Sequence, residues 1–303
     1  MTGREGLFIM KIQNKQKSAT RKKHIRKSSI VMLCSAGVLM AMAAGLLFHT
    51  AVKPAERVQI ASADGTATTA SVLAETMAEP EPVEQKEENP YGIDPDRPMI
   101  ALTFDDGPSK HTWAIVDTLK QHNARATFFV LGSQVATHQA AIDYVLENHN
   151  EIGSHSFGHK NLTKLVSDEE VLDQIRMVDA ALQEQHAYTP ALFRVPYGAK
   201  DDRVQELLKA EGKPIIGWSV DPYDWQVKDK QKVVDHILNC VQDGDIVLMH
   251  DIYEPTAEAV AELVPALQQR GYQLVTVSEL FQYRHVTPQP GAYYRSVPVQ
   301  HFE

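Results

Sequence analysis

Two adjacent carboxylates, Asp105 and Asp106, lie in the segment Thr103-Phe-Asp-Asp-Gly-Pro108, directly after a run of apolar residues. Ionised neighbours repel each other, so such a pair is costly unless a cation lies nearby. A cation needs only one of them as a ligand, and the other is then available as a general base. The same segment is also typical of a plain turn, because Asp, Gly and Pro all favour turns. The pair alone therefore fits either a metal site or a turn.

Two histidines, His155 and His159, lie four residues apart in the segment His155-Ser-Phe-Gly-His159. If this segment forms a helical turn, both rings face the same side and can bind one metal ion. Together with Asp106 they offer two nitrogens and one oxygen, which leaves coordination positions open for water and substrate, as in catalytic zinc sites. Surface histidine pairs are more often solvated than metal-bound, so the spacing does not decide the matter by itself.

Further polar residues follow other apolar runs. They lie in Arg194-Val-Pro-Tyr-Gly198, in Asp221-Pro-Tyr-Asp-Trp225 and, as His250, directly after Ile246-Val-Leu-Met249. Arg194 is suited to orient a catalytic carboxylate through a charge-assisted hydrogen bond. Taken singly, each segment is explained equally well by a surface salt bridge, a turn or a strand end.

From Arg97 onward, apolar runs alternate with helical stretches. Strands are expected at 99–104, 126–131, 151–154, 191–195, 214–219, 245–249 and 273–277, and helices at 111–122, 137–148, 168–185, 202–210, 231–240 and 256–269. Seven such units predict an α/β fold, a distorted (β/α) barrel with about seven parallel strands, with an open doubly wound sheet as the alternative. The carboxyl ends of parallel strands meet on one face, so the polar residues that follow the strands are expected to share one pocket.

Taken together, the polar segments resemble the polysaccharide deacetylases of carbohydrate esterase family 4. The five motifs of that family occur here in the same order: Thr-Phe-Asp-Asp-Gly-Pro at 103–108, His-Ser-x-x-His at 155–159, Arg-x-Pro-Tyr-Gly at 194–198, Asp-x-x-Asp-Trp at 221–225 and Leu-x-His at 248–250. The resemblance covers residues 97–283. One departure is Val195, where the family more often has proline, and little effect is expected from it.

The resemblance implies a function for each of these residues. A divalent metal, usually zinc and alternatively cobalt, would be bound by Asp106, His155 and His159. Asp105 would be the general base, and His250 the general acid, in the hydrolysis of an N-acetyl group. Supporting roles would fall to Arg194, which orients Asp105; Asp224, which tunes His250; the backbone N–H of Tyr197, which binds the oxyanion; and Trp225 and Leu248, which line the acetyl pocket.

The first 95 residues differ in composition from the rest. Residues 1–29 are strongly basic, residues 30–48 form an uncharged apolar run, and residues 49–95 are acidic and rich in Pro, Ala, Ser and Thr. The apolar run is about long enough to span a bilayer, and the basic residues before it place that end in the cytoplasm. We therefore expect a basic cytoplasmic segment, a transmembrane signal-anchor and a disordered linker. A cleaved signal peptide is the alternative.

These boundaries leave a catalytic domain at 96–285 and a C-terminal tail at 286–303. The domain is expected outside the cytoplasm, attached to the cell membrane if the apolar run is retained and secreted if it is cleaved. The net charge of −9, with the basic residues concentrated at the N-terminus, disfavours nucleic-acid binding. Cys34 and Cys240 are not expected to pair, and Cys240 is expected to be a small core residue.

The expected substrate is a cell-wall glycan, most simply the N-acetylglucosamine of peptidoglycan, because the domain would lie on a tether next to the membrane. Chitin oligomers, poly-N-acetylglucosamine and acetylxylan are alternative substrates. A glycan-binding protein on the same fold is a further alternative, which the complete set of acid, base and metal-ligand residues disfavours.

Overall fold

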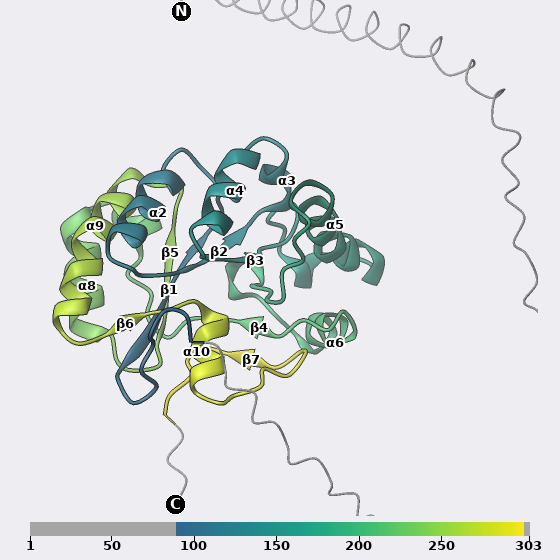
Figure 1. Ribbon diagram of the computed structural model, residues 1–303. Helices are drawn as coiled ribbons and strands as arrows, with labels where there is room; N and C mark the ends of the chain where they lie inside the picture. The colour runs from purple at the N-terminus through teal and green to yellow at the C-terminus, as the bar shows by residue number, and fades with distance from the viewer. Residues whose placement is uncertain (1–88, 300–303) are drawn as a thin grey trace, which may run out of the picture. The chain divides into compact units, whose positions relative to one another are not determined.

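The computed structural model describes residues 89–299 (Figure 1). The expected anchor at 30–48 and nearly all of the expected linker at 49–95 lie outside the described residues. Within 89–299, none of the helices has the length and apolar character that crossing a membrane requires.

A five-stranded parallel sheet forms the centre of the domain (Figure 1). Its strands are β1 (Met99–Asp105), β2 (Thr127–Val130), β3 (Glu151–Ser154), β5 (Ile246–His250) and β6 (Gln273–Leu274). β1 pairs with β5 and β2, β2 pairs with β3, and β6 pairs with the first two residues of β1. The register places Asp105 opposite His250, so two of the expected site residues end neighbouring strands. The α/β class and the parallel sheet are as predicted.

Single bridges continue the pairing beyond these five strands. Phe193 bridges both Ser154 and Ile215, and Val220 bridges Val247 of β5. Strand β4 (Ile215–Ile216) also pairs with β7 (Tyr293–Tyr294). The strand expected at 191–195 is thus reduced to one bridging residue, because Pro190 and Pro196 flank it and neither has an N–H to donate. The strand expected at 214–219 is likewise shortened.

Residues 286–299, which belong to the segment expected to be a tail, pack against the domain. They contribute β7, and the side chain of Val297 is buried. The N–H of Val297 donates to the carbonyl of Gly244 at 2.7 Å. A β-carbon at Gly217 would lie 2.3 Å from the Tyr293 hydroxyl, so the glycine makes room for the Tyr293 side chain.

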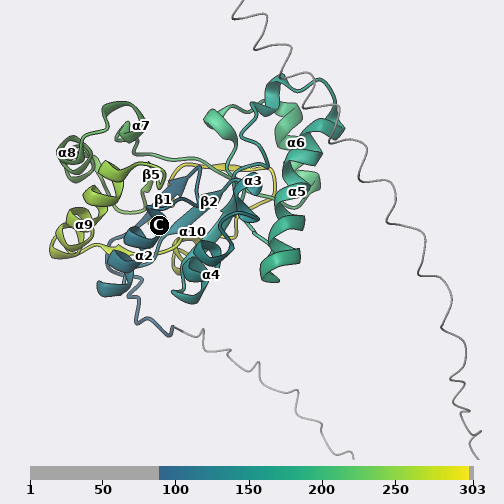
Figure 2. The ribbon, with the colours of Figure 1, turned by 90° about the horizontal axis from the view of Figure 1, so that it is seen from above.

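Helices surround the sheet, and Figure 2 shows α8 and α9 on one side of it and α5 and α6 on the other. They are α2 (Thr112–Gln121), α3 (Gly132–Val135), α4 (Gln139–Glu147), α5 (Asp168–His186), α6 (Asp202–Ala210), α7 (Asp224–Val227), α8 (Lys230–Cys240), α9 (Glu254–Gln269) and α10 (Val277–Tyr283), with single 3₁₀ turns at Leu162–Lys164 and Pro196–Gly198. The six expected helices occur within two residues of their expected bounds. The three others, α3, α7 and α10, are short.

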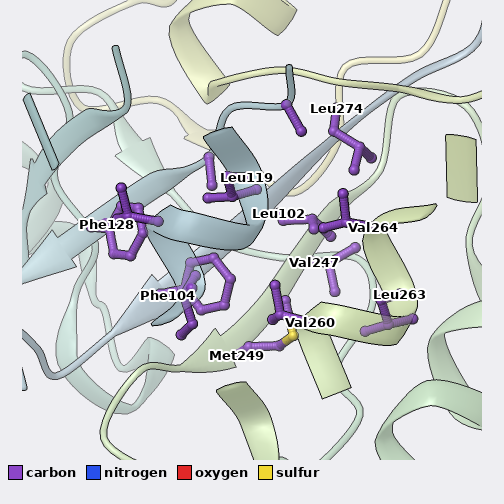
Figure 3. Packing of buried hydrophobic residues seen from close by; sticks show 14 of the residues in the cluster. Leu102, Phe104, Leu119, Phe128, Val247, Met249, Val260, Leu263, Val264 and Leu274 are labelled. Carbon is purple, nitrogen blue, oxygen red and sulfur yellow. The ribbon is translucent and has the colours of Figure 1, made fainter. Parts of the chain in front are cut away.

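The main core lies between β1, β5 and the helices that cover them (Figure 3). Leu102 and Phe104 of β1 and Val247 of β5 are fully buried against Val260 and Val264 of α9. Each such side chain stabilises the fold by about 1.5–3 kcal/mol. This packing fixes the strands whose ends carry Asp105 and His250.

Cys240 is exposed at the last position of α8, so its prediction as a core residue is wrong. The buried face of this helix consists of Val233, Val234 and Ile237 and continues into Val241. Cys240 lies beside this face and not on it.

Candidate active site

A pocket of about 440 Å³ opens at the C-terminal ends of β1 and β5. Most of the expected site residues line it: Asp105, Asp106, His155, His159, Tyr197, Trp225, Leu248 and His250. The other two, Arg194 and Asp224, are buried directly behind it, each in contact with a residue that lines it. Residues from five separate motifs therefore meet at one place.

Asp106, His155 and His159 bring three potential metal-ligand atoms within 4.8 Å of one another. Oδ1 of Asp106 lies 3.6 Å from Nε2 of His155 and 3.3 Å from Nε2 of His159. This Oδ1 is buried, yet it has no hydrogen-bond partner in the described part of the chain. An unpaired buried carboxylate oxygen facing two imidazole nitrogens fits a divalent cation.

Left-handed backbone in a loop, and not a helical turn, brings the two histidines together. Ser156 and His159 have positive φ values of 67° and 53°. The His155 N–H donates to Val130, so His155 continues the direction of β3, and the chain then turns back so that the His159 N–H donates to the Ser156 hydroxyl. The expectation of a helical turn is therefore wrong, although the rings still lie with centroids 5.1 Å apart.

Asp105 is held by the fully buried guanidinium of Arg194. Nη1 of Arg194 donates to Oδ1 of Asp105 and to the hydroxyl of Thr103, each at 2.7 Å. Its Nε and Nη2 donate to the carbonyls of Ile216 and Gly217. Burial lowers the pKa of Arg194, and the charge of Asp105 opposes this shift. The other oxygen of Asp105, Oδ2, lies 3.6 Å from Nε2 of His155, on the side of the expected metal ligands.

Asp224 holds the ring of His250 in a similar way. Its Oδ1 lies 2.8 Å from Nδ1 of His250, and its Oδ2 accepts the His250 N–H at 2.8 Å. Thr256 and the N–H of Trp225 donate to the same carboxylate. Burial alone would lower the pKa of His250, but the hydrogen bond and charge of Asp224 outweigh it and raise the pKa to about 9. The ring is therefore cationic at neutral pH, and Nε2 carries a proton in the pocket.

Comparison with known proteins identifies the family. The family described as "Polysaccharide deacetylase" matches residues 92–215. A peptidoglycan-N-acetylglucosamine deacetylase of Bacillus cereus is 36% identical over 193 residues, which cover 62% of this chain and 90% of the relative. This chain belongs to the polysaccharide deacetylase family.

Two further relatives of this family show how far the likeness extends. The peptidoglycan-N-acetylmuramic acid deacetylase PdaC of Bacillus subtilis is 42% identical over 189 residues, which cover 62% of this chain but only 40% of PdaC. The solved structure of a family 4 acetyl xylan esterase of Clostridium thermocellum, in complex with a cobalt ion, matches with a TM-score of 0.62 and 31% identity, covering 66% of this chain and 99% of that one.

Three further residues of the deacetylase motifs differ in their exposure. Tyr197 is exposed and has φ 62° and ψ 9°, between Pro196 and Gly198. Leu248 is buried, while Trp225 is 46% exposed at the edge of the pocket. Their assignments to the oxyanion and to the acetyl group stay predictions.

Sequence reasoning missed a buried carboxyl beside this pocket, Asp251. Its Oδ2 accepts a hydrogen bond from the Thr112 hydroxyl at 2.5 Å, and its carbonyl accepts one from Ser109. A β-carbon at Gly107 would lie 2.2 Å from either carboxyl oxygen, so the glycine of Asp-Asp-Gly-Pro makes room for this side chain. Burial raises the pKa of Asp251 to about 7. Its only sequence signal is its position directly after His250.

The pocket also includes Trp218 and Tyr253, which no deacetylase motif of this sequence contains. A β-carbon at Gly198 would lie 2.9 Å from the Trp218 ring, so this ring sets the space available beside Tyr197. Tyr253 follows the strand predicted at 245–249, and Trp218 is the second-last residue of the strand predicted at 214–219, so their positions near predicted strand ends were the signal that could have found them.

Proposed function

We propose that this protein is a metal-dependent deacetylase that hydrolyses the N-acetyl group of a polysaccharide, with the N-acetylglucosamine of peptidoglycan as its substrate. One observation carries the proposal: a three-residue cation site, a carboxylate fixed by a buried arginine and a cationic histidine share one pocket. These are the electrophile site, the base and the acid that amide hydrolysis requires. A protein that only binds glycans has no need of all three.

Each residue would make a separate contribution to the hydrolysis. A divalent metal at Asp106, His155 and His159 would polarise the acetamide carbonyl and increase the acidity of water. Asp105, with Oδ1 held by Arg194, accepts the proton of the attacking water at Oδ2. The N–H of Tyr197 binds the carbonyl oxygen as negative charge develops on it. His250 then gives the proton on Nε2 to the departing amine while Asp224 holds Nδ1.

The choice of sugar rests on the relatives. One is named for N-acetylglucosamine in peptidoglycan, another for N-acetylmuramic acid, and a third is an acetyl xylan esterase. To test the choice, the metal-loaded full-length protein would be incubated separately with peptidoglycan, chitin oligomers and acetylxylan, and the released acetate measured. Acetate from peptidoglycan with newly free glucosamine supports the proposal. Acetate from none of the three glycans contradicts it, and acetate only from xylan makes the enzyme an esterase.

We also propose the finer architecture suggested by the sequence. The ring of pairings from β1 through β3, Phe193 and residues 215–220 to β5 forms the distorted barrel of the family. Residues 30–48 anchor this domain to the cell membrane on its outer side. Protease added to intact cells stripped of their wall should then digest the domain. Digestion only after lysis would reject this topology.

A further inference from the structure

The two histidines of the expected metal site must each offer an unprotonated ring nitrogen, and the hydrogen bond at the other nitrogen decides which one it is. For His155 this partner is a backbone carbonyl. Its Nδ1 lies 2.8 Å from the carbonyl oxygen of Arg194. A carbonyl only accepts hydrogen bonds, so Nδ1 carries the proton and the Nε2 lone pair faces the carboxylates.

For His159 the partner is a side chain, the hydroxyl of Tyr197, which lies 3.1 Å from Nδ1. A hydroxyl can donate or accept, so this contact alone leaves the tautomer open. The same hydroxyl also donates to the backbone carbonyl of His159 at 3.3 Å. Its single hydrogen is therefore engaged, and its oxygen is left to accept the proton on Nδ1. The Nε2 lone pair then faces Oδ1 of Asp106, 3.3 Å away.

We propose that the Tyr197 hydroxyl is a positioning group for the metal ligand His159, which it holds in the tautomer that presents Nε2 to the metal. This inference rests on the metal site of the proposed function. It gives Tyr197 a side-chain role in addition to the predicted role of its backbone N–H. The two ligands also differ, because the group that orients His155 is backbone and a substitution of the Arg194 side chain leaves it in place.

The Tyr197 ring has contacts in addition to those of its hydroxyl. The ring meets that of His159 edge-on, with centroids 4.5 Å apart, and Pro196 and Gly198 hold the backbone on either side. Tyr197→Phe therefore removes the hydroxyl and leaves the ring contact. Because Tyr197 is 66% exposed, water can replace part of the lost hydrogen bond. The effect should be at the lower end of the 10- to 100-fold range typical of such partners.

The test uses the full-length protein without any glycan. Zinc affinity would be measured by competition with a chelator, and the tautomer of His159 by NMR of metal-free protein labelled with ¹⁵N at histidine. Tyr197→Phe should weaken zinc binding about tenfold and shift His159 toward a mixture of tautomers, with His155 unchanged. Tyr223→Phe is the matched control, because Tyr223 is also exposed but does not line this pocket.

Wild-type zinc affinity together with an unchanged His159 tautomer in Tyr197→Phe would overturn the inference. An equal loss of affinity in Tyr223→Phe would do so as well, because the effect would then not be specific to the contact. Neither measurement depends on deacetylation. An inactive protein that binds zinc and shows the shift thus contradicts the proposed function and supports the inference.

Discussion

Two histidine–aspartate pairs lie at the same pocket, and the pKa values of their two histidines are shifted in opposite directions. His159 with Asp106 belongs to the expected metal site, and burial lowers the pKa of His159 even though the charge of Asp106 acts to raise it. His250 with Asp224 forms the expected acid, and there the hydrogen bond and charge of Asp224 outweigh burial, so the pKa of His250 rises to about 9. The same two residue types thus give a neutral ring in one pair and a cation in the other.

The difference lies in what surrounds each carboxylate. Asp224 is buried, contacts the ring at 2.8 Å and accepts hydrogen bonds from the backbone N–H of His250 and from Thr256. These contacts hold the carboxylate in place against the ring. Asp106 lies 3.3 Å from His159 and has a second histidine beside it. The other neighbours of a histidine–carboxylate pair therefore decide whether it suits a metal ion or a general acid. Four predictions test this contrast.

The largest effect is expected from removing the metal ion. Chelation should reduce acetate release to background, and Zn²⁺ or Co²⁺ should restore it, because Asp106, His155 and His159 would hold the ion. His159→Ala should greatly weaken metal binding, whereas His122→Ala, on the far end of α2, should not. Full activity in a sample shown by elemental analysis to be free of metal would refute the assignment.

The second effect concerns Asp105, which lies between the two pairs. Asp105→Asn should retain the metal and lower kcat by about 100-fold or more, the scale of a lost general base. Asparagine can still accept the hydrogen bond from Arg194, so the fold should survive. Zinc content and kcat would be measured on the same sample. Loss of zinc would mean that Asp105 and Asp106 exchange roles.

The third effect concerns the His250–Asp224 pair and leaves the expected metal ligands unchanged. Asp224→Asn removes the charge that raises the pKa of His250 to about 9, so this pKa should fall toward the ordinary value near 6.5. The alkaline limb of the kcat profile should then move to lower pH, with a loss of roughly 30-fold at pH 8. Zinc affinity should remain that of the wild type. An alkaline limb that does not move would show that another group is the acid.

The sequence predicted the polar residues of this site better than the backbone that presents them. Motif spacing named Asp106, His155 and His159, and these residues lie together. It gave the wrong local structure for the histidines, because left-handed backbone at Ser156 has no periodic signal. Asp251 was missed because its position directly after His250 is a weak signal, and its approach to Gly107 is visible only in three dimensions.

The fold shows the same division between local and long-range information. The helices with long apolar patterns were predicted to within two residues, whereas β7 was missed because its pairing with β4 joins residues about 80 positions apart. Helix α10 is a different case, since Thr276 and Glu279 form a capping box that the sequence contains. Its seven residues are too few for a clear helical period.

The fourth effect is on stability, where the free energy of unfolding contributed by the two pairs should change with pH in opposite directions. His250 has a folded-state pKa of about 9, above the unfolded value near 6.5. Its contribution to the free energy of unfolding is fully present below pH 6.5 and is lost as the pH rises through 9. This contribution amounts to about 3 kcal/mol at most. His159 has a lowered pKa, so in the metal-free protein its contribution falls as the pH drops below 6.5.

Urea unfolding of the metal-free protein at pH values from 5 to 9.5 would separate these contributions. At each pH, the free energy of unfolding of each histidine variant would be subtracted from that of the wild type. The difference in free energy of unfolding between wild type and His250→Gln should shrink between pH 6.5 and 9, because the His250 ring bound to Asp224 loses its proton in this range. The difference between wild type and His159→Asn should instead grow as the pH rises toward 6.5. Slopes of the same sign would mean that both rings are cationic in the folded protein. The neutral state of His159, on which the contrast between ligand and acid depends, would then be wrong.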